Sequence, residues 1–233
     1  MITPFNKTRH MKDKTQEVSK LFYIFTTLFT TCLIAANLFA LKQFSVGPAR
    51  FTGALFVFPI SYIINDVVAE VWGFRRARNL IWMAFAMNFL FVMLGALVDV
   101  LPGSGGNDEA FHSIFGLAPR VAVASFLAFL VGSFVNAMVL SKMKVRSKGK
   151  HFSLRAMVST VAGEACDSII FFPIALAGIV PWQMMPVFVL WQVGLKTLYE
   201  LIILPITVRV VRKVKLRDGV DVFDIGIKYK LFR

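Results

Sequence analysis

Long apolar stretches recur along this chain, and each is separated from the next by a short polar segment. Six of the stretches are about 20 residues long, the length at which a helix matches the hydrocarbon thickness of a membrane. The polar segments between them are too short to form a soluble domain of their own. We therefore expect a single membrane domain with six transmembrane helices. The predicted spans are about 21–41, 51–72, 80–99, 121–141, 156–180 and 186–208.

This pattern predicts an all-α polytopic membrane protein. A polar extension at 1–20 precedes the membrane domain at 21–208, and a basic tail at 209–233 follows it. Six spans can divide into two halves of three that cross the bilayer in opposite senses, as in many secondary transporters. Spans one and four each carry an asparagine near the same place, Asn37 and Asn136. We therefore expect two inverted three-helix repeats.

Proline also occurs at matching places in spans two and five, where Pro59 and Pro173 each follow a phenylalanine. A proline inside a helix frees a backbone carbonyl one turn earlier and bends the helix. Bent helices at corresponding places in two halves point toward a central binding site. The alternative is that these residues reflect only the general frequency of proline in membrane helices.

The composition and the charge agree with a membrane protein. Apolar residues make up 57% of the chain, whereas soluble domains contain about 45–50%. The net charge is +13, but the basic residues lie at the two ends and in alternate connections. By the positive-inside rule this distribution places both termini in the cytoplasm. We expect the clusters to contact anionic lipid rather than nucleic acid. They lie within 7–20, 75–78, 142–155 and 209–217.

Neither the cysteines nor the histidines form a metal or disulfide motif. Cys32 and Cys166 both lie inside predicted spans, and His112 has no second ligand at metal spacing. The chain also carries no motif of an intramembrane protease or a phosphatidyltransferase, and no P-loop. We therefore expect no cofactor, no metal and no enzymatic activity.

Apart from Asp99 at the very end of the third span, six charged side chains lie inside the predicted spans, five of them acidic. A charge at the centre of a bilayer costs about 2.5–3.5 kcal/mol even on a lenient scale. A polar contact between membrane helices contributes only about 0.6–2 kcal/mol, so these charges are poorly explained as contacts that merely hold helices together. They indicate a transport pathway. The residues are Asp66, Glu70, Glu164, Asp167, Lys196 and Glu200.

Helical spacing groups the polar residues into faces. Glu164, Asp167 and Phe171 share one face of span five, and Gln192 and Lys196 lie one turn apart in span six. Carboxylates with aromatic rings suit a planar, donor-rich heterocycle such as a purine, although a small cation, an amine or a proton path remains open. Glu70 has an alternative interpretation, as the partner of an arginine in the next loop. The predicted substrate-binding residues are Asp66, Glu70, Glu164, Asp167, Phe171, Trp191, Gln192, Lys196, Asn37 and Asn136.

Two motifs resemble the queuosine precursor transporter family of bacterial inner-membrane proteins. The first reads Phe-Pro-Ile-Ser-Tyr at 58–62, Asn-Asp-Val-Val-Ala-Glu-Val-Trp-Gly at 65–73 and Arg-Arg-Ala-Arg at 75–78. The second runs from Arg155 through Ser-Thr, Gly-Glu and Asp-Ser-Ile-Ile to Phe171. The similarity covers about residues 20–215, and the ends of the chain match nothing in the family.

The resemblance implies import of 7-cyano-7-deazaguanine or 7-aminomethyl-7-deazaguanine, for salvage into a modified tRNA base. A guanine-type edge offers two donors to one carboxylate, and its carbonyl accepts from an amide or a lysine. Because carboxylates outnumber lysine within the spans, we expect transport to run with protons or to be driven by substrate trapping. Alternatives are a membrane subunit of an ATP-driven vitamin or nucleobase importer and an ion- or proton-conducting membrane protein. The oligomeric state, a homodimer included, is left open.

Overall fold

The computed structural model describes residues 19–39, 42–46, 49–103, 105–116, 119–178 and 181–231. Within these residues, six helical stretches are long and apolar enough to cross a membrane, which confirms the predicted class of fold. Apart from residues 19 and 20, the predicted extension lies outside the described residues. The long helices are α2 (Lys20–Phe39), α3 (Phe58–Trp72), α4 (Phe74–Asp99), α6 (Pro119–Arg146), α7 (Phe152–Leu176) and α8 (Met185–Asp218).

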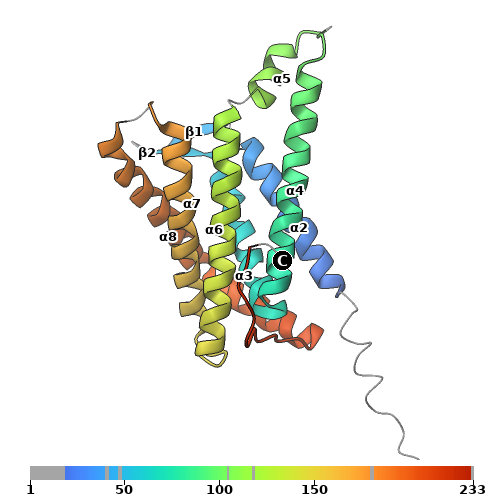
Figure 1. Ribbon diagram of the computed structural model, residues 1–233, viewed down its shortest axis with the longest axis vertical. Helices are drawn as coiled ribbons and strands as arrows, with labels where there is room; N and C mark the ends of the chain where they lie inside the picture. Colours follow the sequence, from blue (N-terminus) through green and yellow to red (C-terminus); the bar gives the residue numbers. More distant parts are fainter. Residues whose placement is uncertain are drawn as a thin grey trace, which may run out of the picture.

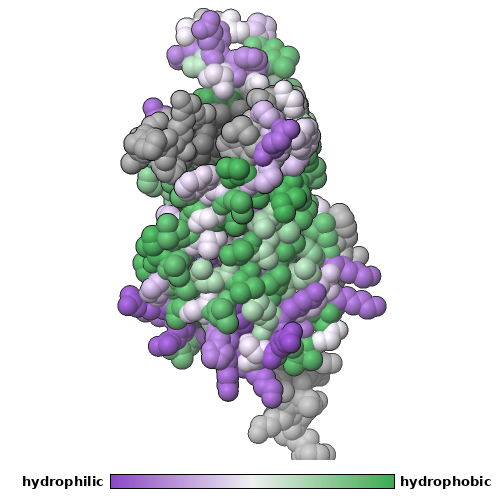
Figure 2. Space-filling model, turned by 90° about the vertical axis from the view of Figure 1, so that its left-hand side faces the viewer, coloured by the Kyte–Doolittle hydropathy of each residue, from purple (hydrophilic) through white to green (hydrophobic). Residues whose placement is uncertain are grey.

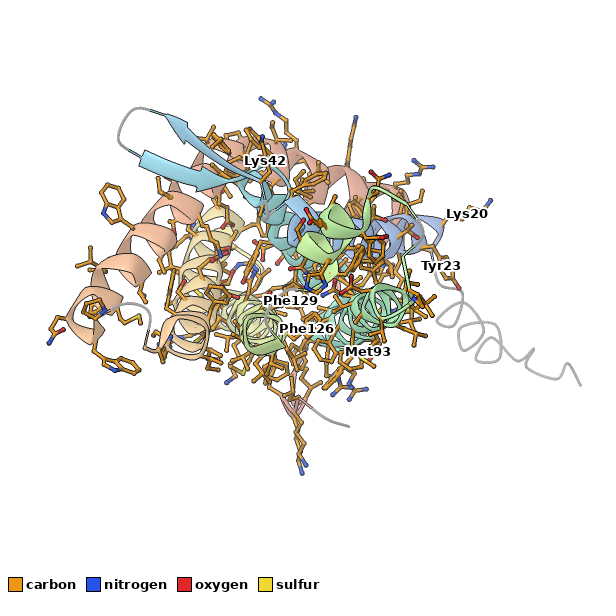
Figure 3. All side chains as sticks on the ribbon, turned by 90° about the horizontal axis from the view of Figure 1, so that it is seen from above. Lys20, Tyr23, Lys42, Met93, Phe126 and Phe129 are labelled. Carbon is orange, nitrogen blue, oxygen red and sulfur yellow. The ribbon has the colours of Figure 1, made fainter. Side chains whose placement is uncertain are left out.

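The long helices lie side by side as a bundle, with α6 between α4 and α7 (Figures 1 and 3). Helices α6 and α7 share the most extensive contact of any pair in the described part of the chain. On its other side, α6 packs through aromatic rings. The ring of Phe126 lies edge-on to that of Phe85 in α4, and the ring centroids of Phe129 and Phe29 in α2 are 6.0 Å apart. These apolar contacts form a core in which α6 is the central helix.

The outer surface of the bundle is apolar, as a lipid-facing surface must be. Figure 2 shows a broad hydrophobic band on the face in view, with hydrophilic residues gathered above and below it. Large apolar side chains are exposed along the helices, among them Met93 and Leu97 of α4 and Leu190 and Ile202 of α8. In water such a surface would be an anomaly, whereas in a bilayer it needs no partner.

The two ends of the bundle differ in charge and structure. One end, which we call the basic end, contains the α3–α4 turn, the α6–α7 connection and the end of α8 (Figure 1). The exposed basic side chains Arg75, Lys148 and Arg217 lie there. The opposite end contains the short helix α5 (Asp108–Phe115) and the hairpin of β1 (Gln43–Val46) and β2 (Ala49–Thr52).

The hairpin was not predicted from the sequence. Gln43 pairs with Thr52 and Val46 pairs with Ala49 in an antiparallel register. A 3-10 turn, η1 (Gly53–Phe56), then leads into α3. The apolar pattern runs without interruption from residue 51 through the helix, so hydropathy alone did not distinguish a strand from the start of a span. Helix α3 therefore begins several residues later than expected.

The two prolines that suggested matching bends occupy different positions. Pro59 lies in the first turn of α3, whereas Pro173 lies inside α7. A first-turn proline causes no bend, because the N–H that it lacks has no helical partner in any case. The expectation that Pro59 bends its helix is therefore wrong. The inverted repeat stays a prediction, without support from this pair of residues.

Candidate functional site

The charged residues of the fifth and sixth spans meet inside the bundle. Glu164 and Asp167 lie one turn apart on α7. Lys196 of α8 reaches both, since its Nζ lies 2.6 Å from Glu164 Oε2 and 3.3 Å from Asp167 Oδ2. The side chain of Glu164 is 2% exposed, and those of Asp167 and Lys196 are each 12% exposed. We call these three residues the Lys196 cluster; fully ionised, it carries a net charge of −1.

Two further carboxyl groups lie near this cluster, and we call them the carboxyl pair. Asp66 of α3 is 0% exposed and Glu200 of α8 is 4% exposed. The two groups lie next to each other, Asn136 of α6 lies beside Asp66, and Thr160 of α7 lies beside Glu200. None of the side-chain polar atoms of Asp66 or Asn136, nor Thr160 Oγ1, makes a hydrogen bond of ordinary geometry within the described residues. Four helices thus direct polar atoms into one buried place.

Tyr62 and two glycines lie between or beside the Lys196 cluster and the carboxyl pair. Tyr62 is 3% exposed and lies within electrostatic range of all four carboxyl groups. A Cβ on Gly132 of α6 would lie 2.9 Å from the Gly163 carbonyl oxygen of α7 and 3.0 Å from the Tyr62 hydroxyl. Only glycine leaves room for this approach of two helix backbones. The backbones of α6 and α7 therefore cross closely beside the candidate site.

The two predicted aromatic residues have different environments. Phe171 is half-buried on α7, one turn beyond Asp167, and its ring packs edge-on to Phe172 at a centroid distance of 5.5 Å. Trp191 of α8 is 67% exposed. Its indole therefore faces outward from the bundle, where a membrane protein meets lipid.

The predicted amide residues also separate. Asn136 lies beside the carboxyl pair, as described above. Asn37 instead donates a hydrogen bond of 3.0 Å to Asn88 and so joins α2 to α4. The side chain of Gln192 lies outside the described residues.

Glu70 is held at the basic end, away from the arginines of the next loop. Arg155 donates two hydrogen bonds to its carboxylate, at 2.5 and 3.1 Å. Lys215 donates a third at 2.6 Å, and Lys144 donates to the Glu70 backbone carbonyl. Glu70 and Arg155 are each 1% exposed. This buried network, which we call the Glu70 network, ties α3, α6, α7 and α8 together.

The residues after α8 fold back over the same end. The Val222 amide donates to the Val71 carbonyl at 3.0 Å. Asp224 accepts from the amide of Phe74 at 2.7 Å, which caps the first turn of α4. A single residue, Gly73 with φ +85°, separates α3 from α4 there. The residues after α8 thus stabilise the one-residue turn between α3 and α4.

Asp221 connects the tail to the Glu70 network. Lys144 donates to its carboxylate, and Lys215 Nζ lies 2.9 Å away. Burial would raise the pKa of Asp221, but the hydrogen bonds and charges of these two lysines lower it on balance. The carboxylate is therefore ionised at neutral pH and supplies negative charge to a network that contains three basic side chains.

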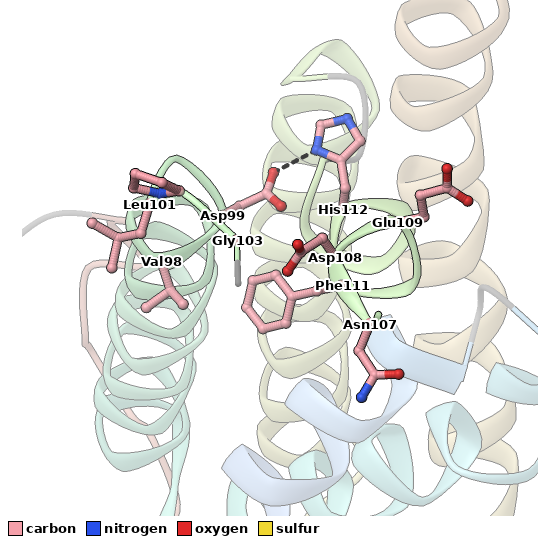
Figure 4. A pocket seen from close by; sticks show the side chains of 10 residues that line it. Val98, Asp99, Leu101, Gly103, Asn107, Asp108, Glu109, Phe111 and His112 are labelled. Carbon is pink, nitrogen blue, oxygen red and sulfur yellow. Dashed lines mark hydrogen bonds and ion pairs between the residues drawn. The ribbon is translucent and has the colours of Figure 1, made fainter. Parts of the chain in front are cut away.

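A separate cavity of about 580 Å³ lies at the opposite end, between the end of α4 and α5 (Figure 4). His112 Nδ1 lies at hydrogen-bond distance, 2.7 Å, from Asp99 Oδ2 on its wall, and the His112 side chain is 73% exposed. The cavity is lined by surface residues and contains none of the predicted site residues. We regard it as a surface cleft under α5 rather than the site itself.

Comparison with known proteins identifies the family. Residues 52–210 match the family model described as "Putative vitamin uptake transporter". The match covers the Lys196 cluster, the carboxyl pair and Glu70. This chain belongs to that family of membrane transporters.

Three relatives share a more specific name. The chain is 29% identical over 151 residues to the "Probable queuosine precursor transporter" of Bacillus subtilis, covering 64% of this chain and 66% of that protein. It is 26% identical over 165 residues to the "Queuosine precursor transporter" of Escherichia coli, covering 70% and 71%. The corresponding protein of Haemophilus influenzae, "Probable queuosine precursor transporter", is 28% identical over 152 residues, covering 64% and 58%. No solved structure matches the chain. The resemblance drawn from the two motifs is confirmed.

Sequence reasoning misjudged two lysines of the Glu70 network and left two polar residues out of the predicted site. Lys144 and Lys215 were counted as loop charges that set orientation, although their side chains are 2% and 22% exposed. Thr160 and Glu200, which lie beside each other, were not among the predicted substrate-binding residues, although helical spacing placed Thr160 on the face of Glu164. One available signal was helical spacing, because Lys144 follows the buried Ser141 by three residues and so shares its face of α6.

Proposed function

We propose that the protein is a secondary transporter that imports queuosine precursors, 7-cyano-7-deazaguanine and/or 7-aminomethyl-7-deazaguanine, across the bacterial inner membrane. The names of the three relatives support this substrate class. The observation that carries the proposal is the Lys196 cluster, in which a lysine and two carboxylates are buried between two membrane helices. Such groups are retained at membrane depth when they bind substrate or ions.

Within the cluster, we assign Asp167 to the donor-rich edge of the base. Lys196 Nζ is closer to Glu164, at 2.6 Å, than to Asp167, at 3.3 Å, although the Asp167 contact is the one with hydrogen-bond geometry. As an ion pair the contact at the longer distance is the weaker one, so we assign it as the contact that is exchanged for a ligand. A deazaguanine ring would present its N1–H and exocyclic amine to Asp167, and its carbonyl oxygen would accept from Lys196. Glu164 would keep the lysine in place throughout.

Phe171 supplies the apolar surface in this arrangement. It follows Asp167 by four residues on α7, so its ring lies one turn farther along the same face. A base held at its edge by Asp167 could therefore stack on Phe171, as bases do on aromatic side chains. Trp191 is excluded from this role because it faces outward.

The orientation of the protein follows from the basic end. We propose that this end, with both termini, lies in the cytoplasm, in agreement with the positive-inside rule. Single cysteines at the exposed positions Asn107 and Lys148, in a background without Cys32 and Cys166, test this orientation. An impermeant reagent added to whole cells should label position 107 and not position 148. Labelling of position 148 alone would invert the proposed topology.

Uptake of labelled 7-cyano-7-deazaguanine into proteoliposomes tests the function. The purified protein alone, without ATP, should transport the base, whereas dependence on an added ATPase would favour the importer-subunit alternative. Asp167→Asn keeps the shape and removes the charge, so the affinity should fall about 10- to 150-fold, the worth of a charged hydrogen bond. Glu109→Gln, which changes an exposed carboxyl on α5, is the matched control. Unchanged binding by well-folded Asp167→Asn would place the substrate elsewhere.

A further inference from the structure

The carboxyl pair is left over once every other buried acid has been given a partner. Glu70 binds Arg155 and Lys215, and Glu164 and Asp167 share Lys196. Within the described residues, no Lys, Arg or His nitrogen forms an ion pair with Asp66 or Glu200. Both groups are nonetheless buried, at 0% and 4% exposure, and adjacent. Two adjacent carboxylates without a cation cannot both stay ionised in such surroundings.

Buried polar side chains surround the carboxyl pair and could bind a small ligand there. Asn136 and Thr160 are 0% and 2% exposed. Asn136 lies within reach of Asp66 and Thr160 within reach of Glu200, but neither contact has ordinary hydrogen-bond geometry. Buried polar atoms without partners are rare, because each costs free energy unless a ligand, water or ion satisfies it. The unsatisfied atoms come from α3, α6, α7 and α8, so whatever they bind touches every helix that lines the candidate site.

We propose that Asp66 and Glu200 form the coupling-proton site of the transporter, distinct from the substrate site at the Lys196 cluster. The proposal rests on the proposed transport function. A proton entering from the outer side forms an O–H bond with one carboxyl and is shared with the other. On the inner side water reaches and hydrates the pair, so the O–H bond breaks, water accepts the proton and both carboxylates are ionised.

A proton fits this place better than a sodium ion. A shared proton needs only two neighbouring carboxyl oxygens, which the pair supplies. Sodium needs several oxygen ligands, which membrane transporters commonly draw from unwound backbone carbonyls. Helices α3 and α8 are continuous through Asp66 and Glu200, so neither backbone is unwound at the pair; within α8, Pro205 leaves the Leu201 carbonyl without its helical donor, which is a single backbone ligand.

The two sites are close enough to influence each other. Glu200 follows Lys196 by one helical turn on α8, and Thr160 precedes Glu164 by one turn on α7. Protonation of the carboxyl pair removes negative charge beside Lys196 and so changes how strongly Lys196 pairs with Glu164 and Asp167. Binding of the proton is thereby coupled to binding of the substrate. The titratable groups that face the pair are Tyr62 and Glu70 on α3, Glu164 and Asp167 on α7, and Lys196 on α8.

The test separates binding from coupling. Proteoliposomes containing wild-type protein, Asp66→Asn, Glu200→Gln or the control Glu109→Gln are assayed in sodium-free buffer with labelled 7-cyano-7-deazaguanine. This proposal reassigns Asp66 from substrate binding to the proton, and neither member of the pair belongs to the Lys196 cluster. We therefore expect both pair variants to exchange internal for external substrate within about twofold of wild type when no pH gradient is present. With an inside-alkaline gradient, wild type and control should accumulate substrate, whereas the pair variants should only equilibrate it. Gradient-driven accumulation by both variants would overturn the proposal, as would accumulation by wild type that requires sodium.

A second measurement requires no substrate. Infrared difference spectroscopy of the purified protein during a pH titration should show a protonated carboxyl at neutral pH that disappears in Asp66→Asn. If wild type fails to exchange the base but shows this band, the substrate assignment is wrong and the proton site stands. If wild type exchanges the base but shows no protonated carboxyl at neutral pH, the proton site is wrong and the transport function stands. The second outcome is decided on wild type alone, whether or not the variants fold.

Discussion

Neutralising Glu70 should destabilise the protein strongly, although Glu70 lies outside the proposed substrate site. The substitution Glu70→Gln leaves the size of the side chain almost unchanged and removes one charge. In the folded protein this carboxylate accepts two hydrogen bonds from Arg155 and one from Lys215. After the substitution, Lys144 and Lys215 would keep Asp221, whereas Arg155 would have no acidic partner within the described network.

The expected magnitude follows from burial. Glu70 and Arg155 are each 1% exposed, so solvent cannot screen the guanidinium once its partner has gone. Removing one partner of a buried ion pair costs about 3–5 kcal/mol. In a protein of this size each kcal/mol corresponds to about 2–4 °C in Tm. The melting temperature of Glu70→Gln in detergent should therefore fall by about 6–20 °C.

A second substitution separates this reasoning from a general intolerance of change. In Glu70→Gln combined with Arg155→Met, both members of the pair are neutral, and Lys215 keeps Asp221 at 2.9 Å. The double variant should recover at least half of the loss, because the cost lies in the unpaired buried charge rather than in the missing pair. Thermal unfolding followed by size-exclusion recovery measures both shifts, with Glu109→Gln as the control. A Glu70→Gln shift no larger than that of the control would refute the argument.

Three further predictions concern packing, pH and the substrate site. Gly132→Ala should lower Tm and impair transport, because its Cβ would lie 2.9 Å from the Gly163 carbonyl oxygen, whereas Gly194→Ala, with open space around it, should leave both unchanged. The lysine partners of Asp221 lower its pKa in the folded state. Its contribution to the free energy of unfolding is therefore complete above the unfolded pKa of about 3.9 and is lost as the pH falls through the lower folded pKa. We therefore expect Asp221→Asn to flatten the acid side of a curve of Tm against pH. Trp191→Leu should leave the substrate Kd within about twofold of wild type, since the Trp191 side chain is 67% exposed. A larger change in Kd would show that the indole contacts the substrate.

The sequence by itself determined the class of fold and the location of the intramembrane charges. Hydrocarbon thickness imposes a length on each span, and the loss of backbone hydrogen bonding to water forces each span to be helical. Both constraints act on local sequence, so six spans can be counted without any knowledge of packing. Spacing along one helix is equally local, and it correctly placed Glu164 and Asp167 on one face.

Only the tertiary structure decided which charge meets which. Glu70 precedes three arginines by a few residues, yet its partners are Arg155, 85 residues away, and Lys215, 145 residues away. The same holds for Asn37, whose partner Asn88 is 51 residues distant. Contacts between helices depend on their rotation and crossing, which periodicity along a single helix does not contain. The division of the buried acids into the Lys196 cluster, the carboxyl pair and the Glu70 network therefore could not be seen in the sequence.

The two ends of the membrane domain show the same distinction. The basic residues indicated an orientation, but the sequence did not show that Lys144 is buried or that Asp224 caps α4. At the opposite end, hydropathy did not separate the hairpin from the span that follows it. Hydrophobic length specifies how many times the chain crosses a bilayer, because that depends on the solvent. Which side chains are paired and which are left for a ligand depends on close packing between distant segments, and that only the folded bundle determines.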